Sequence, residues 1–331
     1  MTKNNSRERV VSGMRPTGKL HLGHYHGVLK NWLTLQNQYD CFFFIADWHG
    51  LTTEYSSPQG IAGSRREILA DWLAVGLDPK KATIFVQSDV KEHAELHLLL
   101  SMIVPVPWLE RVPSYQEMQQ ELTTKDLSTY GFLGYPLLQT ADIILYNANK
   151  VPVGVDQVPH IELSREIVRR FNSLYGPLFV EPKPLLTEAP KLLGMDRRKM
   201  SKSYDNCLTL SDSAATIEKK VLSAITDPDR KRREDPGNPD VCLIFDYHKL
   251  HSEKETIQKI DRECRSAAIG CVEDKKMMAA TINKFLDPIR KKREEWLGQT
   301  DRMDELLGDG ARRARAVAQE MMEKVRKAMK I

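Results

Sequence analysis

The sequence lacks a hydrophobic run long enough to cross a membrane, which takes about 20 apolar residues. Its longest strongly apolar stretch is CFFFIA, Cys41 to Ala46. The first residues, MTKNNSRERVVSG, lack the apolar segment of a secretion signal. Cysteine is scarce too: five in 331 residues, an odd number that favours free thiols in a reducing compartment over disulfides. We therefore expect a cytoplasmic protein that does not bind a membrane.

A large excess of one charge is also missing. Lys and Arg number 49, Asp and Glu 45, and the formal net charge is +4. Such a small excess does not by itself indicate a nucleic-acid partner, and local clusters carry more weight. RKRRED, Arg230 to Asp235, is one basic cluster, and the residues from Ala311 onward form another. With 41% apolar and 28% charged residues, the composition is that of a globular protein of about two domains.

What is present up to residue 206 is an alternation of strands and helices. ERVVSGM, CFFFIAD and ATIFVQ predict three strands that are apolar on both faces, as in parallel sheets covered by helices. Helices are predicted at 22–33, 61–75, 93–121, 137–146 and 159–171, with a break at VPVPW. VPVGVDQ predicts a strand and turn, and YGPLFVEPKPLL a proline-rich connection. The expected fold class is α/β, a doubly wound Rossmann-type parallel sheet.

Beyond residue 206 the strand patterns end and helical patterns dominate, at 211–223, 253–269, 275–296 and 311–329, with Ser211 as the expected N-cap. We predict a catalytic domain at 1–206, in which about 93–150 form an insertion, and an all-helical domain at 207–331. The apolar stripe of the last helix, Ala314, Ala318, Met321, Val325 and Ala328, would allow it to pack back on the catalytic domain.

Two short motifs carry chemistry. HLGH, His21 to His24, follows the first predicted strand and opens a helix; Gly23 permits close approach of a ligand, and the two imidazoles can donate to phosphate oxygens. GMDRRKMSKSYDN, Gly194 to Asn206, sets Lys199 and Lys202 beside short hydroxyls, which suits a polyphosphate. A helix start with surface histidines and a solvated lysine loop are the alternatives for each motif taken alone.

HLGH and KMSKS, in this order on an α/β background, resemble the two signatures of class I aminoacyl-tRNA synthetases. The segments IADWHGLTT, GYPLLQTADIILY and VPVGVDQVPHIELSREIVRRFN are similar to tryptophanyl-tRNA synthetases, and the likeness spans essentially the whole chain. It implies ATP-dependent ligation of L-tryptophan to tRNA(Trp) through a tryptophanyl-adenylate, with release of AMP and pyrophosphate. It also implies ATP with Mg²⁺ as substrate, a homodimer with its interface in the 93–150 insertion, and an anticodon-reading helical region.

The resemblance also implies roles for single residues. His21, His24, Lys199 and Lys202 would be catalytic, the lysines neutralising charge as pyrophosphate leaves. The implied ATP site comprises Arg15, Pro16, Thr17, Gly23, His24, Gly154, Val155, Asp156, Gln157, Leu192, Lys199, Met200, Ser201, Lys202 and Ser203. With a tRNA as partner, Arg230 to Arg233 become candidates for phosphate contacts.

For the amino acid, the resemblance implies that Asp142 accepts the indole N–H. Tyr135 and Gln139 would line the pocket and hold the α-amino group, with His49 nearby. An ordinary helix carboxylate is the alternative for Asp142, although an unpaired carboxylate is costly in such apolar surroundings. Tyr, Gln and Asp at this spacing also resemble tyrosyl-tRNA synthetases, so tyrosine is the alternative substrate, while VPVGVDQ and ADWHGLTT favour tryptophan.

Three cysteines, Cys242, Cys264 and Cys271, resemble part of a four-cysteine iron–sulfur site found in some tryptophanyl-tRNA synthetases, with Asp274 in the fourth position. One reading is a [4Fe–4S] cluster on three thiolates with Asp274 or water on the fourth iron. Three free thiols are the second reading, and zinc bound by Cys₃Asp is the third.

Two rival functions remain. A small-molecule nucleotidyltransferase would also place an HxGH motif on a doubly wound sheet, but it leaves KMSKS and the helical region unexplained. A non-catalytic tRNA-binding paralogue predicts broken signatures, and both signatures are intact here. A requirement for tRNA as acyl acceptor separates the first rival, and tryptophan-dependent ATP–pyrophosphate exchange separates the second.

Overall fold

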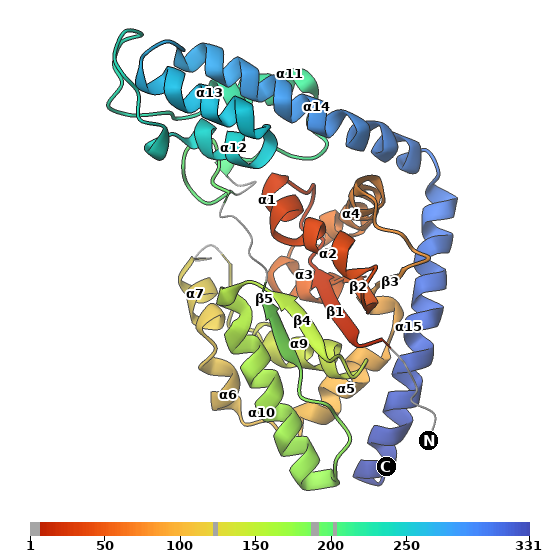
Figure 1. The fold of residues 1–331 in the computed structure, drawn as a ribbon. Coiled ribbons are helices and arrows are strands. Elements are labelled where there is room, and N and C mark those ends of the chain that lie inside the picture. Colours follow the sequence, from red (N-terminus) through yellow and green to blue (C-terminus); the bar gives the residue numbers. More distant parts are fainter. Residues whose placement is uncertain (1–6, 122–124, 187–191, 201–203) are drawn as a thin grey trace.

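The computed structural model describes residues 7–121, 125–186, 192–200 and 204–331. One parallel sheet is built from β1 (Arg9–Met14), β2 (Asp40–Ile45), β3 (Ala82–Val86), β4 (Lys150–Val153) and β5 (Lys183–Leu186). The strand order is β3-β2-β1-β4-β5, so the chain moves outward in one direction from β1 and then in the other from β4 (Figure 1). The predicted doubly wound parallel sheet is confirmed.

The interior strand β2 illustrates why the sheet needs cover on both faces. All but the first of its residues are buried, and successive side chains point to opposite faces. On one face Phe43 stacks on Trp32 with ring centroids 4.3 Å apart. On the other face Phe42 stacks on Tyr146 with centroids 4.7 Å apart. A strand that is apolar on both sides can be stable only between two layers of helices.

Helices from the first half of the chain connect these strands. They are α1 (Leu22–His24), the π-helix η1 (Tyr25–Leu29), α2 (Lys30–Leu35), α3 (Asp47–Glu54), α4 (Gln59–Val75) and η2 (Gln87–Asp89). α4 ends at Gly76, whose φ of 108° is the left-handed conformation that glycine adopts at helix ends. The sequence predicts one helix over 22–33, and the structure differs by inserting a π-helical turn directly after HLGH.

The region between β3 and β5 is helical apart from β4. It holds α5 (Glu92–Ser101), α6 (Val106–Glu110), α7 (Pro113–Glu121), α8 (Tyr130–Leu133), α9 (Tyr135–Ile144), η3 (Val155–Gln157) and α10 (Val158–Tyr175). Pro105 precedes α6 with ψ of 136°, so the predicted break at VPVPW is present. β5 lies in the segment predicted as a connection. Its Pro184 cannot donate a ladder hydrogen bond and is tolerated because β5 is an edge strand.

After residue 206 the described residues form helices. They are α11 (Ala214–Leu222), η5 (Pro239–Val241), α12 (Leu243–His251), α13 (Lys254–Arg265), α14 (Cys271–Leu297) and α15 (Thr300–Met329). The N-cap of α11 is Ser213, whose side chain accepts from the amide of Thr216, and the expected Ser211 lies outside the helix. In the described part of the chain, no helix is long and apolar enough to span a bilayer.

The last helix leaves the other C-terminal helices and runs beside the sheet (Figure 1). α15 lies so close to β3 that a Cβ atom built on Gly310 would stand 1.7 Å from the carbonyl oxygen of Ile84. Arg313 donates to the carbonyl of Pro79 at 2.9 Å, and Arg326 pairs with Glu95 of α5 at 2.7 Å. The helix begins at Thr300, well before the predicted start at Ala311.

Candidate active site

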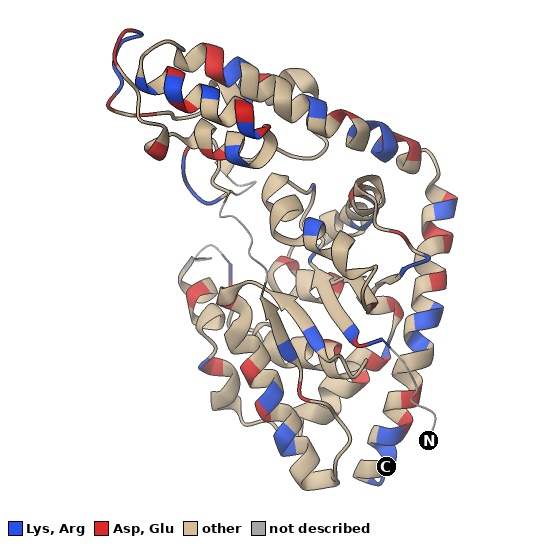
Figure 2. Ribbon diagram, in the orientation of Figure 1, with Lys and Arg blue, Asp and Glu red and all other residues tan. Residues whose placement is uncertain are grey.

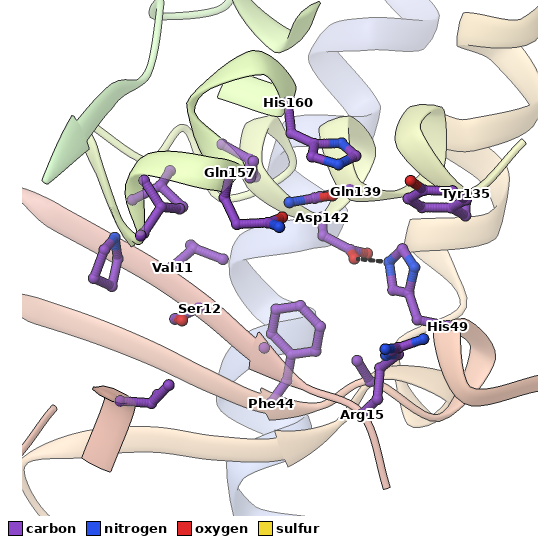
Figure 3. A pocket seen from close by; sticks show the side chains of 18 of the residues that line it. Val11, Ser12, Arg15, Phe44, His49, Tyr135, Gln139, Asp142, Gln157 and His160 are labelled. Carbon is purple, nitrogen blue, oxygen red and sulfur yellow. Dashed lines mark hydrogen bonds and ion pairs between the residues drawn. The ribbon is translucent and has the colours of Figure 1, made fainter. Parts of the chain in front are cut away.

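A cavity of about 370 Å³ opens where β1 and β4 lie side by side. This is the position at which the strand order reverses, and doubly wound sheets bind ligands there, beyond the carboxyl ends of the strands. Figure 3 shows the side chains that face it. Among the sequence-predicted site residues, the cavity brings together Arg15, His49, Tyr135, Gln139, Asp142, Gly154 and Gln157.

Strand geometry explains why residues so distant in sequence meet here. Arg15 follows the end of β1, His49 lies in α3 just after β2, and Gly154 follows β4. Because all strands are parallel, their carboxyl ends lie along one edge of the sheet. On β1 itself, a Cβ at Gly13 would stand 2.5 Å from the ring of Phe44. Glycine is therefore needed where this ring approaches the cavity (Figure 3).

Asp142 on α9 is buried and its carboxylate is fully engaged. Its Oδ2 atom accepts from Nε2 of His49 at 2.8 Å, and its Oδ1 atom lies 2.7 Å from Nδ1 of His93. The side-chain amide of Gln87 donates to both oxygens, at 2.8 and 3.0 Å. A carboxylate offers about four acceptor positions, and these contacts use them all.

The charge state of Asp142 follows from these contacts. Burial alone would raise its pKa, but hydrogen bonds from His49 and His93 outweigh burial and lower the pKa to about 2. Asp142 is thus a carboxylate at neutral pH. Because it can only accept, Nδ1 of His93 carries the proton of this contact, and Nε2 of the same ring lies 2.7 Å from the hydroxyl of Tyr146.

A second group of hydrogen-bonded polar side chains also lines the cavity. Oγ of Ser114 lies 2.8 Å from the hydroxyl of Tyr135 and 2.6 Å from Nε2 of His160. Burial lowers the pKa of His160 to about 4, so its imidazole is neutral at physiological pH. Arg15 reaches the cavity from the other side (Figure 3). Desolvation by the surrounding protein lowers its pKa, but an arginine remains a cation at neutral pH.

The HLGH residues lie on α1 and do not line the cavity. The amide of His21 donates to Nδ1 of His24 at 3.2 Å, and the two rings are in contact, tilted by 43° with centroids 3.8 Å apart. A Cβ at Gly23 would lie 2.9 Å from the ring of His21 and 3.4 Å from Sδ of Met200. The two signatures therefore meet directly, through Gly23 of one and Met200 of the other.

In the KMSKS loop, Met200 is buried while Lys199 is exposed and outside the cavity lining. The carbonyl of Lys199 accepts from the side chain of Asn206 at 3.1 Å, which ties the start of the loop to its end. Three predicted site residues, Ser201, Lys202 and Ser203, lie outside the described residues.

Five further predicted ATP contacts are not among the residues that line the cavity: Pro16, Thr17, Val155, Asp156 and Leu192. Asp156 nevertheless folds over the end of β4, since a Cβ at Gly154 would lie 2.6 Å from its Oδ1 atom. Gln157, which does line the cavity, donates to the same carboxylate at 2.9 Å. The turn after β4 therefore presents one carboxylate and one amide near the cavity mouth.

The metal site predicted at Cys242, Cys264, Cys271 and Asp274 is not supported. Among the described residues, no group of three or more His, Cys, Asp or Glu side chains could hold a metal ion. Oδ1 of Asp274 accepts from Nε2 of the buried His248 at 2.9 Å. Burial raises the pKa of Cys242 to about 11 and also raises that of Cys264. These described side chains therefore give no support to the iron–sulfur or zinc interpretation, and three free thiols agree with them.

The predicted phosphate-contact cluster also has internal partners. Arg230 donates to the carbonyls of Arg233 and Ile269 at 2.8 and 2.9 Å. Arg233 donates to the carbonyl of Ala268 at 2.8 Å and to that of Ala267. Both guanidinium groups therefore hold the turn between α13 and α14. Figure 2 shows basic and acidic residues interleaved over the C-terminal helices.

Four residues of this site were not identified from the sequence: Gln87, His93, Ser114 and His160. The strand-end rule could have found Gln87, which directly follows β3. His160 follows Gln157 on the same short segment and could have been included with it. His93 and Ser114 reach the site only through tertiary contacts, and no local pattern marks them.

Comparison with known proteins agrees with this geometry. Residues 3–287 match the family described as tRNA synthetases class I (W and Y). The chain is 50% identical to a tryptophan–tRNA ligase of Thermotoga maritima, covering 98% of this chain and 99% of that protein. It is 44% identical to one of Aquifex aeolicus, covering 98% and 100%. The crystal structure of tryptophanyl-tRNA synthetase from Campylobacter jejuni complexed with ADP and tryptophan superimposes with a TM-score of 0.90 at 32% identity, covering 98% and 100%. The chain therefore belongs to the class I tRNA synthetases of the tryptophan and tyrosine family.

Proposed function

We propose that the chain ligates L-tryptophan to tRNA(Trp) in an ATP-dependent reaction. The single observation that carries the proposal is Asp142, an ionised carboxylate at the floor of an otherwise largely apolar cavity. An indole presents one N–H donor and a large apolar ring, which this combination suits. The named ligand of the Campylobacter jejuni structure and the names of the curated relatives support the same substrate.

The acceptor positions of Asp142 suggest how an indole would bind. His93 and Gln87 approach the carboxylate from outside the cavity, whereas His49 lines the cavity itself. An incoming indole N–H would therefore replace the hydrogen bond from His49 and leave the other two in place. His49 would then be released toward the amino-acid backbone, and Tyr135 and Gln139 would hold the α-amino group.

In the proposed chemistry the tryptophan carboxylate attacks the α-phosphorus of ATP. The bond between the α-phosphorus and the bridging oxygen breaks, pyrophosphate leaves, and tryptophanyl-adenylate remains. A ribose hydroxyl of the terminal adenosine of tRNA then attacks the acyl carbon and releases AMP. No enzyme nucleophile is needed, so the protein contributes alignment and charge compensation.

We assign the charge compensation to the two signatures and to Arg15. His21, His24, Lys199 and Lys202 would contact the phosphates of an ATP–Mg²⁺ substrate, with Thr17, Gly23 and Ser201 nearby. Gly154, Asp156 and Gln157 would meet the ribose, since they follow the carboxyl end of β4 next to the cavity. Pro16, Val155, Leu192, Met200 and Ser203 complete the proposed ATP site.

The remaining parts of the proposal concern the whole molecule. Residues 1–206 would form the catalytic domain, and 207–331 the helical region that reads the anticodon. The insertion at about 93–150 would contribute to a homodimer interface, and its exposed apolar residues Leu98, Met102 and Val106 favour this. We place the reaction in the cytoplasm, where tRNA is charged.

Tryptophan-dependent exchange of pyrophosphate into ATP, followed by acylation of tRNA(Trp), tests the proposal. Each amino acid is supplied alone, and the exchange is expected with tryptophan and not with tyrosine. A site built around one hydrogen bond discriminates near-analogues by about 10⁴-fold or more, so a tyrosine enzyme would be recognised at once. Exchange without acylation of any tRNA would favour a nucleotidyltransferase, and absence of exchange would favour a non-catalytic tRNA-binding protein.

A further inference from the structure

Arg293 joins the C-terminal helices to the catalytic sheet through a buried ion pair. It lies near the end of α14, and its Nε atom donates to Oδ1 of Asp71 on α4 at 2.7 Å. A second donor of the guanidinium reaches Glu67 one turn earlier on α4. Asp71 is fully buried and Arg293 is 8% exposed. This pair is thus shielded from water, unlike the exposed ion pair that Arg66 of α4 forms with Asp304 of α15.

The other oxygen of Asp71 accepts a hydrogen bond from the backbone just before the HLGH motif. Oδ2 accepts from the backbone amide of Leu20 at 3.2 Å, and Leu20 directly precedes His21. On its other side, the same short segment pairs with the chain that follows the KMSKS loop. Leu210 donates to the carbonyl of Leu20, and Leu22 donates to the carbonyl of Leu208, each at 2.9 Å. One carboxylate therefore connects α14 with the turn that sets the backbone of His21.

The rest of α14 packs against the other C-terminal helices. Lys275, in its first turns, donates to the carbonyl of Leu222 in α11, and Asn283 donates to that of Ala214. Pro288 lies between these contacts and Arg293, and it interrupts the backbone hydrogen bonds of the helix. A movement of the C-terminal helices would therefore reach Asp71 through the last turns of α14, where Arg293 is the charged contact.

The energetic cost of this arrangement argues against a purely stabilising role. Burial raises the pKa of Asp71 to about 6, although Arg293 and the amide of Leu20 act in the opposite direction. A buried ion pair is often no more stabilising than apolar side chains of the same volume. What the pair supplies is a fixed position for the Leu20 amide.

We propose that Arg293 is a positioning residue that orients the turn leading into His21, acting through Asp71. The inference rests on the proposed function, because His21 matters here only as part of an ATP-binding signature. It extends that function by coupling the placement of the C-terminal helices to the catalytic step. Neither Arg293 nor Asp71 lines the cavity, so the coupling acts on geometry and not on contact with the amino acid.

The experiment measures tryptophan-dependent ATP–pyrophosphate exchange for the wild type, Arg293→Gln, Arg293→Lys and the control Arg66→Gln. The control breaks the exposed pair between α4 and α15 and leaves Leu20 untouched. Misplacement by a remote substitution can cost about 10²-fold in rate, so we expect kcat to fall on the order of 10-fold to 100-fold in Arg293→Gln. The KM for tryptophan should stay within about twofold, since Asp142 and its partners lie on other elements. Arg293→Lys should recover part of the loss, and Arg66→Gln should match the wild type.

A double-mutant cycle with Asp71→Asn decides whether the two residues act as a unit. If they do, the double variant is no slower than the slower single variant. Retention of wild-type kcat in Arg293→Gln with only a lowered Tm would overturn the proposal, as would losses that multiply in the double variant. Failure of the proposed function itself would be visible separately, because the wild type would then lack tryptophan-dependent exchange. Should Arg293→Gln not fold, Arg293→Lys and Asp71→Asn carry the same comparison.

Discussion

Nδ1 of His93 lies 2.7 Å from Oδ1 of Asp142, and neither residue is more than 2% exposed. His93 never reaches the cavity, yet with Gln87 it fixes the carboxylate that the cavity presents. The orientation of the Asp142 carboxylate is thus fixed by residues outside the cavity, which a ligand would not contact. Support of this kind keeps a binding group in place while its partner in front is exchanged.

Asp142→Asn should impair recognition of the indole. The new amide would point an N–H₂ group toward the donors of Gln87, His49 or His93, and the ligand would lose a charged acceptor. A hydrogen bond to a charged group is worth about 1.5–3 kcal/mol, so kcat/KM for tryptophan should fall about 10-fold to 100-fold. N1-methyltryptophan, which lacks the indole N–H, provides the check in the exchange assay. Equal discrimination against this analogue by both proteins would rule out the assigned role.

His93→Leu should make tryptophan binding more sensitive to acid. His93 lowers the pKa of Asp142, and His49 supplies the other lowering hydrogen bond, so removal of His93 raises that pKa from its value of about 2. The carboxylate form exists above the pKa and is lost as the pH falls through it. The KM for tryptophan in the variant should therefore rise at a higher pH than in the wild type, measured between about pH 4 and 8.

Tyr146→Phe is the matched control for this titration. It removes the hydroxyl that lies 2.7 Å from Nε2 of His93 but leaves the contact between His93 and Asp142. Its pH profile should lie closer to the wild type than that of His93→Leu. Identical profiles for all three proteins would mean that His93 does not control the ionisation of Asp142.

Gly310→Ala should destabilise the protein strongly, because the added methyl would collide with the backbone of Ile84 in β3. Overpacking against a rigid neighbour costs about 3 kcal/mol. Gly308 lies on the same helix, and a Cβ there would meet only Arg312, at 3.9 Å. Gly308→Ala should thus stabilise the helix by about 0.5–1 kcal/mol. Urea denaturation of both variants checks the prediction, and similar midpoints would contradict it.

Asp274 should stabilise the fold through its hydrogen bond with His248 and should not bind iron. Asp274→Ala leaves the buried His248 without its carboxylate partner, and an unsatisfied buried group costs about 1–3 kcal/mol. Asp274→Asn keeps an acceptor oxygen and should lose less. Protein purified without oxygen should carry no stoichiometric iron or acid-labile sulfide. Four of each per chain would establish a cluster and refute the assignment.

The strands that form the site were predictable because each carries a strong local pattern. β1, β2 and β3 are apolar on both faces, and Arg15, His49 and Gly154 follow strand ends, where ligands bind in this fold class. The short strand β5 was missed because its sequence KPLL contains proline and is too brief to show a period. The π-helical turn after His24 likewise has no recognisable pattern in the sequence.

The sequence could not predict which distant side chains donate hydrogen bonds to the carboxylate of Asp142. His93 and Gln87 stand 49 and 55 positions from Asp142. The packing of α5 against α9 brings His93 to it, and Gln87 reaches it from the end of β3. The metal prediction lacks support from the described residues for a related reason. His248 on α12 already forms a hydrogen bond with the carboxylate of Asp274. The spacing of the cysteines alone gives no information about this alternative partner.

The path of α15 has a consequence for how the protein is made. The sheet's edge strand β3 ends at Val86, but the helix that lies along it is Thr300–Met329. During synthesis the edge of β3 stays uncovered until nearly the whole chain has left the ribosome. An uncovered strand edge is a template for pairing with other chains. A ribosome that stalls before residue 300 would therefore release an aggregation-prone protein, even though every residue that lines the cavity had already been translated.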